Sequence, residues 1–214
     1  MVEAELWYRP SYFPRGQERN WRQSCDREVG FVRNTVGVCD VSTLGKIDIQ
    51  GPDSAKLLDL VYTNKFSTLK VGKVRYGLML REDGFVMDDG TCARLGETHY
   101  LMTTTTGAAG EVMRHLEFVT QCLHPEWQVH LSSVTEQWAQ FAVAGPKSRE
   151  LLNGLLAQPI DNDSFPFMAC GGVRLGGVEA RLFRISFSGE HAYEIAVPAR
   201  YGAALFDLLV ARAE

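Results

Sequence analysis

Apolar and polar positions follow the same order twice along this chain of 214 residues. Two short apolar stretches, 47–50 and 139–144, predict strands, and the leucines at helical spacing after each of them predict a helix. Between strand and helix stands Gly-Pro, with a serine two residues further on, at Gly51 and again 94 residues later at Gly145. Because proline is favoured at the first helical position, each copy predicts a strand, a tight turn and a helix.

The pattern that follows each helix also repeats. It predicts two paired strands, joined at 83–84 in the first half and at 176–177 in the second, then a further strand and a helix. The predicted elements are strands 76–81, 85–94 and 100–105 with helix 107–122, and strands 173–175, 180–186 and 193–197 with helix 201–211. The order strand–helix–strand–strand–strand–helix in both halves predicts an α+β fold. We expect two pseudo-duplicated, ferredoxin-like halves, at about 44–122 and 138–212, within a clefted domain over 37–214.

An N-terminal arm and helix are expected over 1–36. Residues 7–15 are rich in aromatic side chains and contain two prolines, which exclude a regular helix and favour an extended arm packed on the domain or on an interface. Apolar residues at Val29, Val32 and Val36 predict one face of a helix over 20–36.

Composition narrows the classes of function. The formal net charge is −4 and no basic run is present, which argues against nucleic acid as a partner. No apolar run approaches the ~20 residues that a membrane helix needs, so we expect no membrane partner. The cysteines are odd in number and widely spaced, and the N-terminus lacks a signal-peptide pattern. We therefore expect reduced cysteines and a cytoplasmic location. The histidines show no metal-ligand spacing, so no metal site is expected.

Asp88 and Asp89 follow the predicted hairpin turn and are the first candidate for chemistry. Adjacent strand residues point to opposite faces, so the two carboxylates cannot act together as acid and base on one substrate. Asp89 shares its face with the larger apolar side chains Phe85 and Met87, where an unpaired carboxylate is costly. That cost favours a functional role for Asp89; the alternative is an ordinary carboxylate near a turn.

Two further polar features stand at strand ends. A threonine run, 103–106, precedes Gly107, with Thr106 as a candidate N-cap whose helix could meet an anionic or polar ligand group. Glu194 begins an apolar strand, where a glutamate either faces solvent or, if buried, binds a ligand or partner. Each of these signals also fits an ordinary structural role.

Several segments, taken in order, resemble the glycine-cleavage T-protein (aminomethyltransferase) family. They are 37–45, the first Gly-Pro motif, 62–64, 83–89, the second Gly-Pro motif and 188–190. Within that family, other segments are similar to the C-terminal part of the α subunit of heterotetrameric sarcosine oxidase. These are 46–52, 75–80, 101–106, 133–139 and 184–190. The resemblance covers about 7–211.

The resemblance implies a tetrahydrofolate-binding domain. It places Asp89 at the family's functionally critical aspartate and Glu194 at the carboxylate that holds the pterin. Tyr76 and Thr105 match folate-binding positions, and Phe187 stands where T-proteins carry tyrosine, which puts a hydroxyl contact there in doubt. The implied reaction converts an iminium, generated by a flavin elsewhere, into 5,10-methylenetetrahydrofolate and glycine. A single carboxylate near the folate amine suffices for it.

The resemblance also implies partners and missing parts. Other sarcosine oxidase subunits are the expected protein partners, with FAD, FMN and NAD bound only in parts outside this chain or in those subunits. The family continues beyond position 214 with an arginine-containing segment and a small β-barrel, so we expect weak or no activity from this chain alone. Two alternatives remain: a non-catalytic folate-binding or subunit-docking fragment, and a metal-dependent hydrolase using Asp88 and Asp89, which their diverging side chains disfavour.

Overall fold

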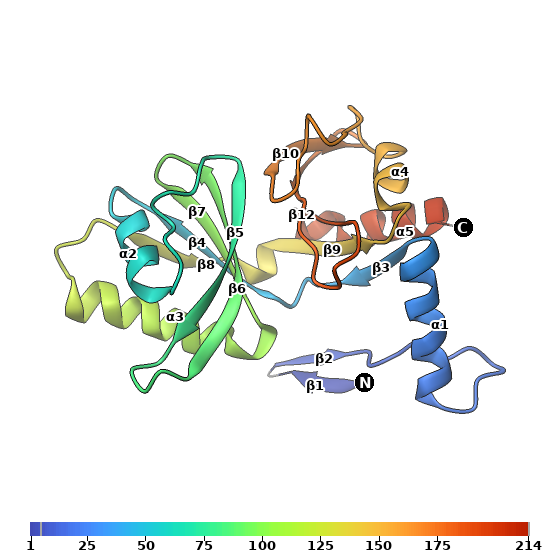
Figure 1. Ribbon diagram of the computed structural model, residues 1–214, viewed down its shortest axis with the longest axis horizontal. Coiled ribbons are helices and arrows are strands. Elements are labelled where there is room, and N and C mark those ends of the chain that lie inside the picture. The colour runs from blue at the N-terminus through green and yellow to red at the C-terminus, as the bar shows by residue number, and fades with distance from the viewer. Residues whose placement is uncertain (5, 214) are drawn as a thin grey trace. The chain divides into compact units, whose positions relative to one another are not determined.

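The computed structural model describes residues 1–4 and 6–213, and its contacts divide the chain into two compact units. The first-repeat unit consists of Thr43–Gln137 and Met168–Gly171. The second-repeat unit consists of Met1–Ser42, Trp138–Phe167 and Gly172–Glu214. Each unit is built around one five-stranded sheet, and the predicted repeats fall in different units (Figure 1).

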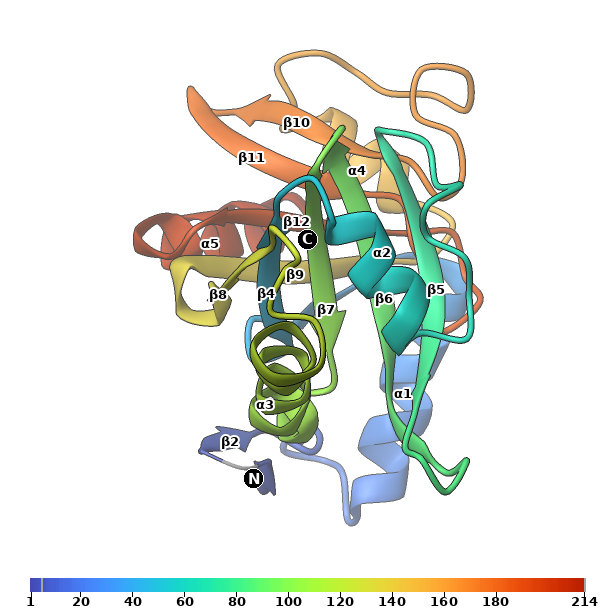
Figure 2. The same ribbon diagram turned by 90° about the vertical axis from the view of Figure 1, so that its left-hand side faces the viewer.

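The first-repeat unit has the strand order β5-β6-β7-β4-β8, with antiparallel neighbours throughout. Its strands are β4 (Gly45–Gln50), β5 (Lys73–Leu80), β6 (Val86–Gly96), β7 (His99–Thr104) and β8 (His130–Ser133). Its helices α2 (Ser54–Val61) and α3 (Ala109–Phe118) cover the same face of the sheet (Figure 2). A 3₁₀ turn, Thr106–Ala108, leads into α3, and a π-helical turn, Val119–Leu123, follows it.

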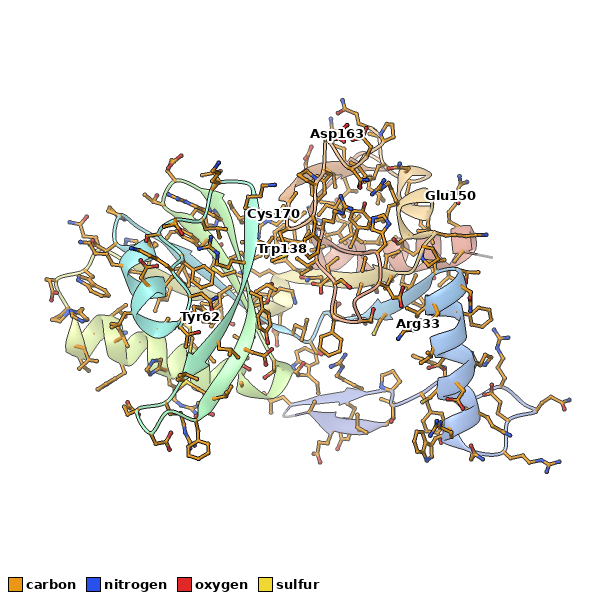
Figure 3. The ribbon with its side chains drawn as sticks, in the orientation of Figure 1. Arg33, Tyr62, Trp138, Glu150, Asp163 and Cys170 are labelled. Carbon is orange, nitrogen blue, oxygen red and sulfur yellow. The ribbon has the colours of Figure 1, made fainter. Side chains whose placement is uncertain are left out.

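The core of this unit lies between the sheet and the two helices. Ile47 and Ile49 occupy every second position of β4, so they lie on the same face of the sheet, and both are buried. Leu58 of α2 and Leu116 of α3 are also completely buried against them. Tyr62, at the end of α2, forms a bridge to Met79 of β5 and closes this side of the core (Figure 3). Each such side chain contributes about 1.5–3 kcal/mol to folding.

The second-repeat unit has the strand order β10-β11-β12-β9-β3. Its strands are β3 (Gly37–Asp40), β9 (Trp138–Ala144), β10 (Cys170–Leu175, shared at its start with the first-repeat unit), β11 (Val178–Phe183) and β12 (Ala192–Pro198). Its helices are α1 (Trp21–Asn34), α4 (Ser148–Asn153) and α5 (Gly202–Ala213), and β1 (Val2–Ala4) and β2 (Trp7–Arg9) form a separate two-stranded sheet. The predicted strand–helix–strand–strand–strand–helix order is confirmed in both halves.

The outer strands β3 and β8 were not predicted, and they are exchanged between the repeats. β3 immediately precedes the first repeat along the chain but pairs with β9 of the second. β8 immediately precedes the second repeat but pairs with β4 of the first. Their registers correspond. Gly37 of β3 pairs with Ala144, which directly precedes Gly145, and His130 of β8 pairs with Gln50, which directly precedes Gly51. Short local patterns carry no information about such distant partners.

The Gly-Pro turns have the same geometry in both units. Gly51 has φ 133° and Gly145 has φ 128°, a region that L side chains rarely adopt. In each turn the serine three residues on donates its N–H to the glycine carbonyl, at 3.1 and 3.0 Å. The helices begin at those serines, so the prediction that the prolines occupy the first helical position was wrong. What the two copies of the motif share is therefore the backbone conformation at glycine, not a proline in the first helical position.

The predicted N-terminal helix is confirmed as α1, which Asn20 caps by accepting from the Gln23 N–H. Its expected apolar face is only partly covered, because Val29 is 54% exposed and Val32 is half-buried. Phe31, outside that face, is also 42% exposed. Residues 1–42 group by contacts with the second-repeat unit. The arm is extended as expected, in the form of the strand pair β1–β2.

Candidate functional site

The centre of the candidate site is the segment Asp88-Asp89-Gly90 on β6, in the first-repeat unit. A Cβ at Gly90 would lie 2.0 Å from the backbone oxygen of Thr103. Only glycine therefore lets β6 approach the end of β7 so closely. This approach brings the Asp88 carboxylate beside the turn that follows β7.

Asp88 is the buried member of the pair. Its carboxylate accepts hydrogen bonds from the Thr105 N–H at 3.1 Å and from Thr105 Oγ1 at 2.8 Å. Burial raises the pKa of Asp88, and the two bonds from Thr105 oppose that rise. Asp88 thus ties β6 to the turn before α3, a structural task. Thr105, not Thr106, precedes this turn, so the prediction of Thr106 as N-cap was wrong; its hydroxyl lies 3.2 Å from Thr43 Oγ1.

Asp89 lies on the opposite face and is partly exposed. Its Oδ2 accepts a hydrogen bond from the hydroxyl of Tyr76, on the neighbouring strand β5. That bond raises the pKa of Tyr76, so the hydroxyl keeps its proton and remains a donor. Asp89 Oδ1 has no hydrogen-bond partner within residues 1–4 and 6–213. The site therefore presents one oriented carboxylate with an accessible oxygen.

The expected reason for singling out Asp89 was wrong. The apolar interior lies on the face of Asp88, together with its neighbours Met79 and Cys92. The face of Asp89 carries Tyr76 and Leu78, which are 48% and 37% exposed. The predicted divergence of the two carboxylates is confirmed, since Asp88 and Asp89 bind different partners.

Two threonines whose contact the sequence did not predict continue the polar row of Asp89. Thr91 lies two residues further along β6, and its hydroxyl is 2.8 Å from that of Thr103 on β7. Thr103 Oγ1 also lies 3.1 Å from the Thr91 backbone N–H. Threonines alternating along paired strands are the only signal that could have predicted this contact.

The raised pKa of Asp88 predicts how the free energy of unfolding depends on pH. A raised pKa means that the folded chain holds this proton more tightly than the unfolded chain. The ionised form therefore costs stability, and the cost grows as pH rises from about 4, the usual aspartate value, through the pKa of the folded state. We expect Asp88→Asn to gain free energy of unfolding relative to wild type across that window and then to level off. Urea denaturation at pH values from about 4 to 8 measures this difference.

Asp83 gives a control of opposite sign. The Phe85 N–H and Arg81 lower the pKa of this exposed carboxyl, so its ionised form is favoured in the folded state. Asp83→Asn should therefore lose stability relative to wild type only as pH rises to about 4, and the difference should stay constant over the window in which Asp88→Asn changes. A difference between Asp88→Asn and wild type that does not change with pH would contradict the raised pKa of Asp88.

The remaining predicted residues belong to the second-repeat unit. Glu194 of β12 is partly buried and accepts a hydrogen bond from Gln140 Nε2 of β9. Gln140 is itself 1% exposed, and its Oε1 has no partner within the described chain. Phe187, in the loop between β11 and β12, is fully exposed. Of the five predicted site residues, only Tyr76 and Asp89 are bonded to each other.

Residues 1–4 and 6–213 contain no group of three or more His, Cys, Asp or Glu side chains that could hold a metal ion. No helix within those residues has the length and apolar character required to span a bilayer.

Comparison with known proteins identifies the family of the chain. The GCVT N-terminal domain family matches residues 1–214. Sarcosine oxidase subunit alpha of Rhizobium meliloti (strain 1021) is 56% identical over 211 residues, 98% of this chain and 21% of that protein. An aminomethyltransferase of Thermus thermophilus is 36% identical over 168 residues, 77% of this chain and 45% of that protein.

A solved structure agrees on the fold. Glycine cleavage system aminomethyltransferase T from Bartonella henselae superposes with a TM-score of 0.76 at 23% identity, over 91% of this chain and 51% of that one. The chain thus spans about a fifth of the length of its sarcosine oxidase relative and about half of the aminomethyltransferases.

Proposed function

The chain belongs to the GCVT N-terminal domain family, and we propose that it is the tetrahydrofolate-dependent one-carbon transfer domain of a sarcosine-oxidase-like α subunit. The observation that carries the proposal is the Tyr76–Asp89 pair, which presents a single oriented carboxylate on an accessible sheet face. The 56% identity to a sarcosine oxidase α subunit over 98% of this chain supports the choice of branch.

In the proposed reaction, a flavin outside this chain supplies the oxidation of the amine substrate to an iminium. A nitrogen of tetrahydrofolate attacks the methylene carbon, a C–N bond forms, and the electron pair of the C=N bond moves to the substrate nitrogen. The attacking nitrogen becomes cationic and must lose a proton. A second folate nitrogen would then displace glycine, whose departing nitrogen takes up the two protons that the folate nitrogens lose, and 5,10-methylenetetrahydrofolate results.

Asp89 would act on the cationic nitrogen. Its carboxylate stabilises the developing positive charge and accepts the proton through Oδ1, while the Tyr76 hydroxyl holds Oδ2 and fixes the orientation of the group. General-base assistance of this kind is worth about 10²- to 10⁴-fold in rate. The exposed side chains of Tyr76 and Leu78 supply apolar surface beside the carboxylate for a flat heterocycle.

Glu194 would bind the pterin. Its carboxylate can accept the adjacent N–H donors of the pyrimidine edge of the pterin, in the bidentate manner that favours charge-assisted hydrogen bonds. Gln140 holds one of its oxygens through Nε2 and so orients the group. Thr105 and Phe187 complete the proposed folate-binding set. FAD, FMN and NAD would be bound by other parts of the whole enzyme.

A folate titration tests this proposal. We expect the 214-residue chain to bind tetrahydrofolate, and Glu194→Gln or Asp89→Asn to weaken binding by about 10- to 100-fold, because each removes a charged acceptor. Isothermal titration calorimetry under anaerobic conditions measures the affinity. Glu179→Gln, which removes an exposed carboxylate paired with Arg174 at 2.9 Å, is the matched control. An affinity that neither Glu194→Gln nor Asp89→Asn changes would contradict the assignment of these two residues to the folate site.

A second candidate function is subunit docking without catalysis. It is favoured by apolar side chains on α1 that stay exposed: Trp21 is 58% exposed, in addition to Val29 and Phe31. Other sarcosine oxidase subunits would be the partners. Co-elution of the chain with those subunits, lost on Phe31→Asp but not on the folate-site changes, would support docking.

A further inference from the structure

A cationic cluster in the second-repeat unit remains unused by the proposed function. Arg149 of α4 donates from Nε to the Tyr193 hydroxyl at 3.0 Å and from Nη2 to His191 Nε2 at 3.1 Å. The Tyr193 hydroxyl lies 3.1 Å from the same His191 nitrogen. Asn162, in the loop that Asp163 marks in Figure 3, accepts a further bond from Arg149. Three elements distant in sequence therefore meet around Tyr193.

A second guanidinium joins the cluster. Arg184 lies over the Tyr193 ring, 5.9 Å from its centroid, and donates from Nη1 to the Phe165 carbonyl at 2.8 Å. Its Nε is buried and has no hydrogen-bond partner in the described chain, and the same is true of Ser186 Oγ two residues further on. A buried donor without an acceptor is costly, because its bonds to water are lost and not replaced.

No carboxylate of the described residues forms an ion pair with either guanidinium group. Neither Arg149 nor Arg184 has an ion pair within 4.0 Å there. Glu190, next to His191, pairs instead with Arg33 of α1 at 2.9 Å (Arg33 is labelled in Figure 3). Asp161 is near enough for Arg149 to contribute to lowering its pKa, but its oxygen accepts from Ser164.

The first repeat shows how the same arrangement is neutralised internally. Arg94, at the end of β6, lies over Tyr100, 5.4 Å from the ring centroid, as Arg184 lies over Tyr193. Arg94 donates to the carbonyls of Leu69 and Glu97 at 2.7 Å and to the Glu97 carboxylate at 3.3 Å. The second repeat lacks such a carboxylate among its described residues and has gained Arg149 and His191. The two copies of one Arg–Tyr pair thus differ mainly in their charge balance.

We propose that Arg149, Arg184 and His191 form a binding site for a small oxyanion, a carboxylate or phosphate group of a small molecule. Within the described residues, Nη1 of Arg149 and Nη2 of Arg184 donate to no partner, and guanidinium groups match the geometry of both anions. Arg149 and His191 are partly exposed, so an anion can reach them. Tyr193 and Glu194 are adjacent on β12 and point to opposite faces, so this site is separate from the proposed pterin carboxylate.

His191 lies in a cationic environment. Burial, Arg149 and Arg184 all lower the pKa of its imidazole. Its Nε2 receives the Arg149 N–H, which requires that nitrogen to be unprotonated and places the proton of the neutral ring on Nδ1. A bound anion would offset the two guanidinium charges and raise the pKa of His191.

Calorimetric titration of the 214-residue chain with inorganic phosphate, and separately with acetate, tests the site at low ionic strength. We expect saturable binding of at least one anion, and the stronger of the two identifies the ligand group. Arg149→Gln should weaken it by about 10-fold or more, since a charge-assisted bond is lost. The matched control Arg174→Gln removes an equally charged but exposed side chain of β10 and should leave binding unchanged.

Titration of His191 followed by NMR supplies a second readout. In wild type its pKa should rise on adding the anion, and in Arg149→Gln it should already be higher without anion. Because Arg149 is partly exposed, this variant decides the question even if Arg184→Gln fails to fold. Absence of saturable binding by both anions, or equal weakening in Arg149→Gln and Arg174→Gln, overturns the proposal.

Discussion

Replacing Asp89 with asparagine should lower the rate of one-carbon transfer by about 10²- to 10⁴-fold, the range of general-base assistance. Asparagine has the same shape and can still accept the Tyr76 hydroxyl bond through its oxygen, but it can neither take a proton nor offset a positive charge. The side chain is partly exposed and outside the core, so the fold should persist. At saturating tetrahydrofolate, where the weaker binding of this variant is overcome, the loss therefore measures chemistry.

Formation of 5,10-methylenetetrahydrofolate in a single turnover, with the whole α subunit and its partners, measures this effect. Oxidation of the amine by the flavin should continue at its normal rate, because the proposed function assigns that step to parts outside this chain. Asp83→Asn, on the same hairpin and exposed, is the control and should leave transfer unchanged. Normal transfer by the Asp89→Asn enzyme would sink the proposed role of this carboxylate.

Gly51→Ala should cost the chain about 3–5 kcal/mol of stability, among the largest effects of a single substitution. The backbone at Gly51 has φ 133°, and a Cβ there would lie 2.1 Å from the Gln128 carbonyl oxygen. Relief would require moving that backbone, whose oxygen also accepts the Asp53 N–H. Gly145→Ala should behave alike, because its Cβ would lie 2.5 Å from the Thr35 carbonyl oxygen.

Gly84→Ala separates the backbone strain of a positive φ from the close contact of an added Cβ. Gly84 also has a positive φ, 84°, but no atom lies within 4 Å of an added Cβ, so only the backbone strain of about 1–2 kcal/mol is expected. Urea denaturation of the three variants and wild type gives the free energies. Equal losses at Gly51 and Gly84 would show that the close contact in the Gly-Pro turn contributes nothing.

Much of the fold could be predicted from local pattern. The repeated Gly-Pro-x-Ser motif indicated the duplication, and the leucine spacing located α2 and α4 within a few residues. Periodicity succeeds here because a helix or strand must present its apolar side chains at its own period to one face. The helices and hairpins close over short distances along the chain, so their signals are local.

Burial of the paired aspartates could not be predicted in the same way. Alternation established that Asp88 and Asp89 diverge, but which face of β6 is covered depends on where α2 and α3 pack. Counting apolar neighbours on β6 alone favoured the wrong face, because strand β5 contributes Met79 to one side and the exposed Tyr76 to the other. Asp89 was singled out by this mistaken argument about its face and, separately, by the resemblance, and its proposed role awaits the Asp89→Asn measurement.

By itself, the amino-acid sequence determined the order of elements, their duplication and the family of the chain, since these depend on residues close together or on a specific series of motifs. Only the tertiary structure decided the exchange of β3 and β8, the partners of Asp88 and Asp89, and the unbalanced charges around Tyr193. Many of those features join residues far apart along the chain. Their energies come from contacts and desolvation that exist only once distant segments have packed together.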